Sequence, residues 1–134
     1  MRERGHIMGK LVMVIDDSST VRNIIANCLS SKGFEVQGFS DGVEAMHWLT
    51  KPEKRVPDLV ILDISLPKMD GYEVARRLKS KPQFSNTIIV MLSRHDGMID
   101  KLKARLVGAK DYLSKPFSTQ DIVAVIESHL GVQQ

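Results

Sequence analysis

Short runs of almost uninterrupted apolar residues constrain the fold of this chain more than any other feature of its sequence. The two strongest are Val56 to Asp63, which ends in LVILD, and Thr87 to Leu92, which reads TIIVML. A strand with one face in water alternates apolar and polar side chains, whereas an uninterrupted apolar strand is covered on both faces. Strands of this kind form parallel sheets between two layers of helices. These runs therefore predict an α/β fold.

Three further runs complete the strand candidates: Leu11 to Ile15, Asp111 to Leu113, and a weaker run at Glu35 to Phe39. Each of the five runs is followed by a segment whose apolar residues recur at helical spacing. These residues are Val21, Ile24, Ile25, Cys28 and Leu29, then Val43, Met46 and Leu49, then Val74, Ala75 and Leu78, then Leu102 and Leu106, and finally Ile122, Val125, Ile126 and Leu130. Strand and helix are therefore expected to alternate five times.

Capping signals agree with this division of the chain. Ser18 or Ser19 is suited to cap the first helix, and Gly33 to end it. Asp70 is placed to open the third helix, and Ser118 to cap the last. The boundaries of the helices are thus predicted by local chemistry as well as by apolar spacing.

The alternation predicts a flavodoxin-like, doubly wound (βα)5 sandwich whose parallel sheet has the strand order 2-1-3-4-5. In such a sheet, ligands bind beyond the carboxyl ends of the strands, where the order reverses between the first and third strands. The polar residues that end or follow the strands are Asp16, Asp17, Asp63, Ser93 and Lys115. We expect these five residues to meet at one edge of the sheet.

At 134 residues, the chain has the length of a single globular domain. We expect a flexible N-terminal segment at residues 1–10 and one domain at residues 11–131. The one cysteine, Cys28, has no second cysteine with which to form an intrachain disulfide, as is typical of proteins in a reducing cytoplasm. No apolar stretch is long enough to cross a bilayer. The expected localisation is cytoplasmic, without membrane insertion.

The charge of the chain gives no indication of a nucleic-acid partner. Lysine and arginine number 19 against 16 aspartates and glutamates, a net charge of +3. The basic residues are scattered among the acidic ones, and the basic tracts at 51–55 and 76–81 contain no interleaved aromatic residues. Because nucleic-acid sites combine a continuous basic surface with stacking side chains or a reading element, we expect no direct nucleic-acid binding.

Three carboxylates at one sheet edge, those of Asp16, Asp17 and Asp63, repel one another, so their pKa values rise unless a cation lies between them. Mg²⁺ suits one or two carboxylates, a backbone carbonyl and several waters, and it leaves a position for a phosphate oxygen. A carboxylate in such a site can act as a nucleophile and form an acyl phosphate. Asp63 is best placed for this, while Lys115 and Ser93 can supply the cation and the donor that phosphoryl transfer needs.

Four stretches resemble the successive motifs of CheY-like response-regulator receiver domains, which belong to two-component signalling. They are VMVIDDSSTVR, LVILDISLPKMDGYEVARRLK, IIVMLSRHDG and GAKDYLSKPFS. The resemblance extends from Leu11 to about Leu130. It includes an acid pair, an acceptor with Pro67 and Gly71 downstream, a hydroxyl, an aromatic residue and a Lys-Pro pair, all in the order of the family. Within the family, the chain is most similar to single-domain regulators of twitching and chemotaxis-type pathways.

This resemblance implies a role for each residue that matches a metal or acceptor position of the family. Asp63 is implied as the phosphoacceptor and, together with Asp17, as a direct ligand of Mg²⁺. Asp16 is implied as a ligand that acts mainly through water. The backbone carbonyl of Ser65 is implied to complete the protein ligands.

The resemblance also implies the residues of a switch. Ser93 corresponds to the hydroxyl that moves to bind the phosphoryl group, and Tyr112 to the aromatic residue that turns inward behind it. Lys115 corresponds to the ion-pair partner of the phosphoryl group, and the Lys115–Pro116 bond is expected to be cis.

Three positions near the site do not follow directly from the family pattern. Position 94 is usually a small residue in the family, whereas this chain has Arg94, which either crowds the phosphoryl site or engages it. Ser65 and His95 occupy positions that tend to set the lifetime of the acyl phosphate. The sequence leaves their effect on that lifetime open.

The implied function is that of a phosphorylation-activated signalling switch, with intrinsic Mg²⁺-dependent transfer and slow self-hydrolysis, rather than a metabolic enzyme. The expected phosphoryl donor is a sensor histidine kinase or a phosphotransfer protein. Phosphorylation is expected to shift a conformational equilibrium and to alter partner binding at the face of helix 4, strand 5 and helix 5. Because no effector domain follows Leu130, we expect the downstream target on another protein chain and the protein itself as a monomer or weak dimer.

Two alternatives come from other classes of function. A phosphorylation-independent interaction module stays open because of Arg94, which would hinder phosphorylation if its side chain crowds the expected phosphoryl site. A phosphoaspartyl hydrolase of the haloacid-dehalogenase type requires a DxD motif at the end of the first strand and a cap domain. The adjacent pair Asp16 and Asp17, in a chain of 134 residues, does not fit that type.

Overall fold

The computed structural model describes residues 9–51 and 55–133. Within these residues the strands are β1 (Leu11–Ile15), β2 (Glu35–Phe39), β3 (Leu59–Asp63), β4 (Ile88–Ser93) and β5 (Asp111–Ser114). The helices are α1 (Ser19–Ser30), α2 (Gly42–Leu49), α3 (Gly71–Lys79), α4 (Met98–Leu106) and α5 (Thr119–Leu130), with the 3-10 helix η2 at Pro82–Phe84. The predicted fivefold alternation of strand and helix is confirmed. Most of the predicted flexible segment, residues 1–8, lies outside the described residues.

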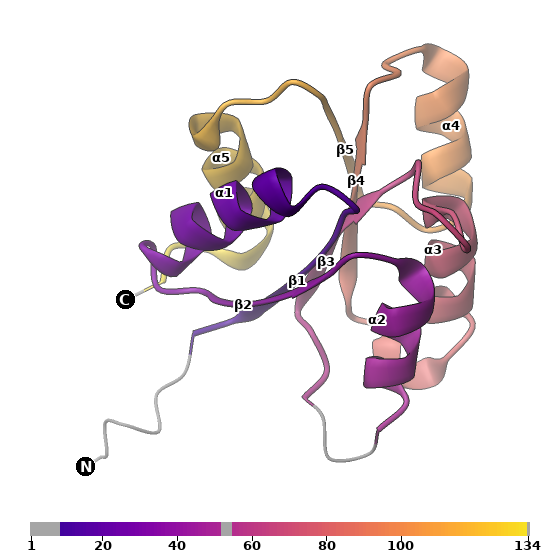
Figure 1. Ribbon diagram of the computed structural model, residues 1–134, viewed down its shortest axis with the longest axis horizontal. Helices are drawn as coiled ribbons and strands as arrows, with labels where there is room; N and C mark the ends of the chain where they lie inside the picture. Colours follow the sequence, from indigo (N-terminus) through magenta and orange to yellow (C-terminus); the bar gives the residue numbers. More distant parts are fainter. Residues whose placement is uncertain (1–8, 52–54, 134) are drawn as a thin grey trace.

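The five strands form one parallel sheet in the predicted order β2-β1-β3-β4-β5. Figure 1 shows that α1 and α5 cover one face of this sheet and that α2, α3 and α4 cover the other. The register pairs Ile15 with Leu62 and Ser93 with Ser114. Because these residues lie at the carboxyl ends of neighbouring strands, the loops that follow them open onto the same edge of the sheet.

Alternating side chains divide the interior into two hydrophobic cores. In β3, Val60 and Leu62 belong to the core under α2 and α3, whereas Leu59 and Ile61 belong to the core under α1 and α5. Every residue of β1 and β3 is buried. Since both faces of these strands are covered by helices, neither face requires polar side chains, which explains the continuous apolar runs in the sequence.

The predicted start of the third strand at Val56 is wrong, because β3 begins at Leu59. Pro57 has no backbone N–H to contribute to a sheet ladder. The N–H of Leu11 donates to the Asp58 carboxylate over 2.8 Å, and the N–H of Asp58 donates to the carbonyl of Leu11 over 2.8 Å. Residues 56–58 therefore form a loop before β3 that these two hydrogen bonds hold against Leu11.

The predicted limits of the fourth strand are also shifted by one residue, because β4 comprises Ile88–Ser93 instead of Thr87 to Leu92. The hydroxyl of Thr87 donates to the carbonyl of Pro57 over 2.8 Å, so this buried side chain fixes the loop before the strand. At the other end, Ser93 pairs with Ser114, which also extends β5 by one residue beyond the prediction. The sheet therefore reaches closer to the predicted site than the sequence indicates.

The predicted helix caps are found where the sequence places them. Ser18, not Ser19, caps α1, and Asp70 caps α3. Ser118 and Asp121 form a reciprocal capping box at the start of α5. The helix α1 ends at Ser30, and Gly33 adopts a left-handed φ of 90° in the turn that follows. These caps fix the helix starts next to the carboxyl ends of β1, β3 and β5.

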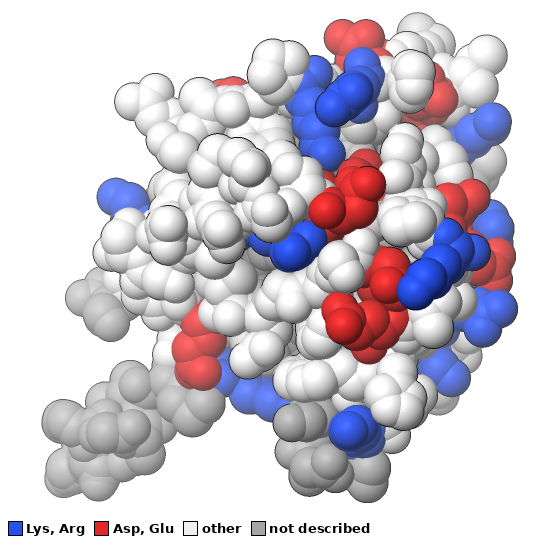
Figure 2. All heavy atoms as spheres, viewed as in Figure 1, with Lys and Arg blue, Asp and Glu red and all other residues white. Residues whose placement is uncertain are grey.

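The surface carries both signs of charge in close proximity. In Figure 2, acidic and basic side chains alternate over the part of this face formed by α2, α3 and α4, while the part formed by α1 and α5 is mostly uncharged. Among the described residues, no helix is both long enough and apolar enough to cross a membrane.

Candidate functional site

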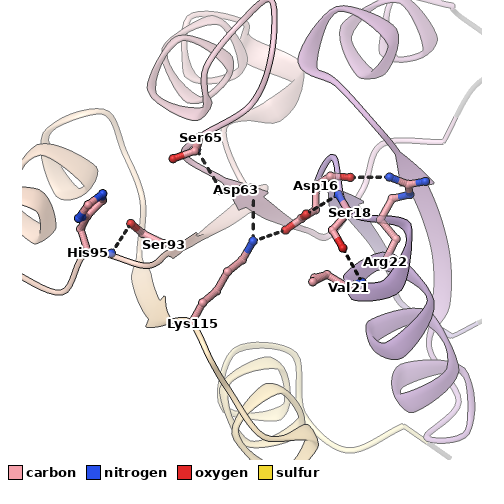
Figure 3. Close-up of polar contacts among 9 residues, drawn as sticks. All are labelled: Asp16, Ser18, Val21, Arg22, Asp63, Ser65, Ser93, His95 and Lys115. Carbon is pink, nitrogen blue, oxygen red and sulfur yellow. Dashed lines mark hydrogen bonds and ion pairs between the residues drawn. The ribbon is translucent and has the colours of Figure 1, made fainter.

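An ion-pair cluster lies at the carboxyl edge of the sheet, formed by residues from the ends of β1, β3 and β5 (Figure 3). The ammonium nitrogen of Lys115 is 2.8 Å from Asp16 Oδ2 and 3.3 Å from Asp63 Oδ2. The side chain of Asp16 is fully buried, and that of Asp63 is 6% exposed. Since both carboxylates are removed from water, their negative charge depends on the neighbouring ammonium for compensation.

At the carboxyl ends of the neighbouring strands β1, β3 and β4, the same kind of local hydrogen bond holds a polar side chain. The N–H of Ser18 donates to Asp16 Oδ1 over 2.9 Å, and the N–H of Ser65 donates to Asp63 Oδ1 over 3.0 Å. Ser93 Oγ accepts the N–H of His95 over 2.9 Å. In each case a side-chain oxygen bonds the backbone two residues later, which is the preferred turn of aspartate and serine. The residue type thus fixes each side chain at its strand end.

The acid cluster has the composition of a cation site. Asp16, Asp17 and Asp63 each offer a carboxylate oxygen, and these three oxygens lie within 4.8 Å of one another. Opposite ligands of a magnesium ion are about 4 Å apart, so this spacing is close to that of a shared hard cation. Asp17 is exposed, whereas Asp16 and Asp63 are buried. The cluster can therefore bind a metal ion that is reached from solvent on the side of Asp17.

The pKa values of the central pair reflect this arrangement. Burial raises the pKa of the Asp63 carboxyl and the charge of Asp16 raises it further, while the Ser65 N–H and Lys115 oppose the rise. Burial lowers the pKa of Lys115, but its hydrogen bond to Asp16 and the charge of Asp63 outweigh burial and raise it. The ammonium form of Lys115 is thus favoured, and an additional cation near Asp63 would favour the carboxylate form.

A solvent-accessible cleft of about 630 Å³ exposes one side of this cluster. Its lining includes Asp17, Asp63, Ser65, Arg94 and Lys115. Of the two buried carboxylates, Asp63 lines this cleft and Asp16 does not. Arg94 is exposed and adds a second cation to the lining. The cleft is suited to an anionic group that lies between cations and contacts the Asp63 carboxylate.

Ser93 and Tyr112 form a second group, on the other face of the sheet. Ser93 continues the alternation of Ile89 and Met91 towards α4, and Tyr112 pairs with Met91 and packs against the same core. The Tyr112 hydroxyl donates to the backbone carbonyl of His95. The backbone N–H of the same residue, His95, donates to Ser93 Oγ. The two predicted switch residues are therefore connected through the backbone of His95.

Two contacts at the site were not predicted from the sequence. Arg22 Nη1 donates to the carbonyl of Asp16 over 2.6 Å, which fixes the backbone at the acid pair. The signal for this contact is the position of Arg22 one turn into α1, directly above the loop that ends β1. At Gly71, a Cβ atom would lie 2.5 Å from the carbonyl oxygen of Asp63, so only glycine permits this close approach of α3. The Lys115–Pro116 bond is cis, as predicted.

Comparison with known proteins places this geometry in a family. The model of the response regulator receiver domain matches residues 12–127. The PilG protein of Pseudomonas aeruginosa is 38% identical over 122 residues, which cover 91% of this chain and 88% of PilG. The chemotaxis response regulator CheY4 of Vibrio cholerae superposes with a TM-score of 0.84 at 30% identity, over 92% of this chain and all of that one.

A putative response regulator of Chloroflexus aurantiacus superposes with a TM-score of 0.82 at 31% identity, over 91% of this chain and 98% of that one. The residues that the family model matches, 12–127, include all four strand ends that carry the candidate site. The chain belongs to the response-regulator receiver family, and it is a CheY-like receiver domain of the kind that functions in two-component signalling.

Proposed function

We propose that this protein is a phosphorylation-activated signalling switch in which Asp63 accepts a phosphoryl group. The observation that carries this proposal is the contact of one buried carboxylate with both an ammonium and an acid cluster. Lys115 Nζ lies 3.3 Å from Asp63 Oδ2, and the carboxylate oxygens of Asp63, Asp16 and Asp17 lie within 4.8 Å of one another. A charged nucleophile with cations around it is the arrangement that phosphoryl transfer requires.

The three carboxylates are not equivalent as nucleophiles. Asp16 and Asp63 each have one oxygen bound by a backbone N–H and one by Lys115, but Asp16 is fully buried and does not line the cleft. Asp17 is exposed and is suited to hold a cation at the mouth of the cleft. Asp63 ends the buried strand β3 and lines the cleft, so it combines a fixed position with access for a donor. Asp63 is therefore the proposed acceptor.

In the proposed transfer, an Asp63 carboxylate oxygen attacks the phosphorus of a phosphohistidine. The new P–O bond forms as the P–N bond to the histidine breaks, and the electron pair of the broken bond stays on the imidazole. The donor is a sensor histidine kinase or a phosphotransfer protein. Lys115 stays protonated and binds a phosphoryl oxygen through a charge-assisted contact, for which its raised pKa is favourable.

The acid cluster is proposed to hold Mg²⁺, with Asp17 and Asp63 as direct ligands together with the carbonyl of Ser65. Asp16, which is fully buried and does not line the cleft, would contribute through water and through Lys115. When bound, Mg²⁺ neutralises the charge of the cluster and of the incoming phosphoryl oxygens. The fit rests on three oxygens of hard-ligand type, which Mg²⁺ prefers.

Ser93 and Tyr112 are proposed to transmit the modification. A Ser93 hydroxyl that turns to a phosphoryl oxygen must leave the N–H of His95, and His95 also binds the Tyr112 hydroxyl. The change at Asp63 thus reaches a ring that packs beside α4. The proposed result is a population shift that alters partner binding at the face of α4, β5 and α5.

The remaining features of the proposal concern the protein as a whole. The functional unit is a receiver domain at residues 11–131, and it acts in the cytoplasm as a monomer or weak dimer on a downstream protein target. Its own chemistry is limited to phosphoryl transfer and slow self-hydrolysis, so its role is signalling.

Mass spectrometry of the intact protein, after incubation with acetyl phosphate and Mg²⁺, tests this function. We expect a gain of about 80 Da, the mass of HPO₃, that is abolished in Asp63→Asn. Asp58→Asn is the matched control, because Asp58 precedes the same strand at its opposite end. A gain that persists in Asp63→Asn would move the acceptor to another residue.

The same experiment decides the alternative of a phosphorylation-independent interaction module. Arg94 favours that alternative, because its exposed side chain lines the cleft that the donor must enter. Under this alternative, the wild type gains no mass, whereas Arg94→Ala gains it because the obstructing side chain is removed. If Arg94 engages the phosphoryl group instead, the wild type gains mass faster than Arg94→Ala.

A further inference from the structure

The ammonium group of Lys79 is held by backbone carbonyls at the amino end of β4, away from the candidate site at the carboxyl ends of the strands. Lys79 is the last residue of α3, and its Nζ is 3.2 Å from the carbonyl oxygen of Phe84 and 3.4 Å from that of Ser85. It also donates a hydrogen bond to the carbonyl oxygen of Thr87. Three carbonyl oxygens of the loop that leads into β4 therefore converge on one cation. We call these three oxygens the carbonyl site.

The charge of this ammonium is not balanced by an ion pair. Among the ion pairs of the described residues, none includes Lys79. Burial lowers the pKa of Lys79, and the charge of Lys110 lowers it further. The positive charge is therefore stabilised by the dipoles of neutral carbonyl groups, although a second cation lies nearby.

The buried residue Thr87 depends on this contact. It is 3% exposed, its hydroxyl donates to the carbonyl of Pro57 over 2.8 Å, and its N–H donates to the carbonyl of Phe84 over 3.1 Å. The Lys79 ammonium binds the remaining polar group of Thr87, its carbonyl. Because a buried carbonyl that loses its partner costs free energy, the carbonyl site requires a cation.

The stem of Lys79 passes against the turn between α4 and β5. Gly108 lies in this turn with a left-handed φ of 102°. A Cβ atom at Gly108 would lie 2.8 Å from Lys79 Cγ, so the turn approaches the stem more closely than any other residue type permits. The same side chain therefore contacts the loop before β4 and the turn before β5.

We propose that the carbonyl site is a binding site for a monovalent cation of the K⁺ and ammonium class, which the Lys79 side chain fills as a built-in ion. Neutral carbonyl oxygens replace the hydration shell of K⁺ in proteins, and an ammonium group has nearly the same size as K⁺. A divalent ion such as Mg²⁺ is bound through carboxylates, which the carbonyl site does not contain. Through this cation, the starts of β4 and β5 are held together.

Thermal unfolding of two variants tests the proposal. Lys79→Ala empties the carbonyl site, whereas Lys79→Met loses the same charge but keeps a stem against Gly108 and fills the site with a methyl group. In tetramethylammonium chloride, whose cation is too large for the site, both variants should unfold at least about 5 °C below the wild type.

The same measurement in potassium and ammonium chloride, at the same ionic strength, separates binding from screening. Either ion should raise the Tm of Lys79→Ala by about 3 °C over its value in tetramethylammonium chloride. The wild type and Lys79→Met, in which the site is filled, should change by less than about 1 °C.

The position of the ion is tested through Lys110. Because its charge opposes a cation in the carbonyl site, Lys79→Ala/Lys110→Ala should reach half of the stabilisation at a potassium concentration at least about twofold lower than Lys79→Ala. Lys79→Ala/Lys32→Ala, which removes an exposed charge of α1's C-terminal turn, is the matched control and should behave as Lys79→Ala does. Equal potassium dependence of all three variants would place the ion elsewhere and overturn the proposal.

Three further results would also overturn it. They are an unchanged Tm in both single variants, equal stabilisation of Lys79→Ala by potassium and tetramethylammonium, and equal stabilisation of Lys79→Ala and Lys79→Met by potassium. If Lys79→Ala is unfolded in tetramethylammonium chloride, circular dichroism replaces the Tm as the readout. Potassium or ammonium should then restore its helical signal, and failure of both ions would contradict the proposed site.

Discussion

The centre of the sheet and its β5 edge differ in how firmly their side chains are held. Every residue of β1 and β3 is buried, and in β4 only Ile88 is partly exposed. All four residues of β5 are partly exposed, and the neighbouring helix α4 buries Ala104 alone. The carboxylate of Asp63, the proposed acceptor, ends a strand of the firm centre. Tyr112 and the exposed apolar side chains of α4, such as Leu102 and Leu106, belong to the looser edge.

This difference suggests that the centre of the sheet holds the reactive groups, whereas the β5 edge undergoes the conformational change. A fixed centre keeps the carboxylates of Asp16 and Asp63 in place at Lys115, so the proposed phosphoryl transfer does not require rearrangement of the core. A loosely packed edge can adopt two arrangements at small cost, because few buried contacts must be broken.

The largest effect is expected from shortening a buried side chain of the centre. Leu62→Ala should lower the free energy of unfolding by about 4 kcal/mol, because it leaves a cavity in the core under α2 and α3. Leu106→Ala at the edge should change it by less than about 0.5 kcal/mol, since its side chain is already in water. Urea unfolding of both variants measures the contrast. Similar losses would show that α4 is packed as firmly as the centre.

Removing the ammonium of the site is expected to have the next largest effect. Lys115→Met should lower the free energy of unfolding by about 3 kcal/mol at neutral pH without metal, because Asp16 and Asp63 lose their shared partner. The raised pKa of Lys115 means that its contribution is present below the ordinary lysine pKa and is lost as the pH rises through the raised value. Lys110→Met, at an exposed lysine of the edge, should have almost no effect. If Lys110→Met lowered the free energy of unfolding as much as Lys115→Met, the proposed difference between the centre and the edge would be contradicted.

Added Mg²⁺ should stabilise the centre through the acid cluster. At a concentration ten times its dissociation constant, it should raise the free energy of unfolding by about 1.4 kcal/mol. Asp17→Asn should lose most of this gain, because Asp17 is the exposed member of the cluster. Asp96→Asn, at an exposed acid outside the cluster, is the control. Thermal unfolding with and without Mg²⁺ measures the gain, and an equal gain in wild type and Asp17→Asn would move the ion to a different site.

The smallest effect is expected from the pH dependence of Asp63 in the absence of metal. Burial and the charge of Asp16 raise the pKa of its carboxyl above the ordinary value of 3.8. The folded chain therefore binds this proton more tightly than the unfolded chain, and the associated stability is lost as the pH rises through the raised pKa. Asp63→Asn does not ionise, so it should be more stable than the wild type at pH 7 and lose this advantage near pH 4. An advantage that does not depend on pH would indicate another cause.

Much of the fold is predictable from the sequence because burial on both faces leaves a direct mark on composition. The apolar runs of β1, β3 and β4 are almost uninterrupted, which predicts a parallel sheet. The parallel sheet in turn predicts that the polar residues after these strands meet at one edge. The strand limits at Val56 and Thr87 were wrong, since Pro57 and the Thr87 hydroxyl take part in loop contacts that apolar content does not reveal.

Two features of the β5 edge could not be predicted from the sequence: the orientation of α4 and the hydrogen-bonded link between Ser93 and Tyr112. The helical spacing of Leu102 and Leu106 predicts α4 correctly, but the same spacing fits a stripe that faces the core or one that faces water. The orientation depends on Ala104, whose small side chain lets α4 pack against the sheet. The link from Ser93 to Tyr112 was also hidden, because it runs through backbone atoms of His95 that any residue carries.

The most direct test of the account compares amide chemical shifts with and without beryllofluoride, which mimics a phosphoryl group at Asp63. In the wild type we predict shifts near Asp63 and a second set along α4 and β5, with little change in β1. In Ser93→Ala the shifts near Asp63 should remain and the second set should largely disappear. If the second set is absent from the wild type, or persists in full in Ser93→Ala, the centre does not control the edge through Ser93 and the central claim is contradicted.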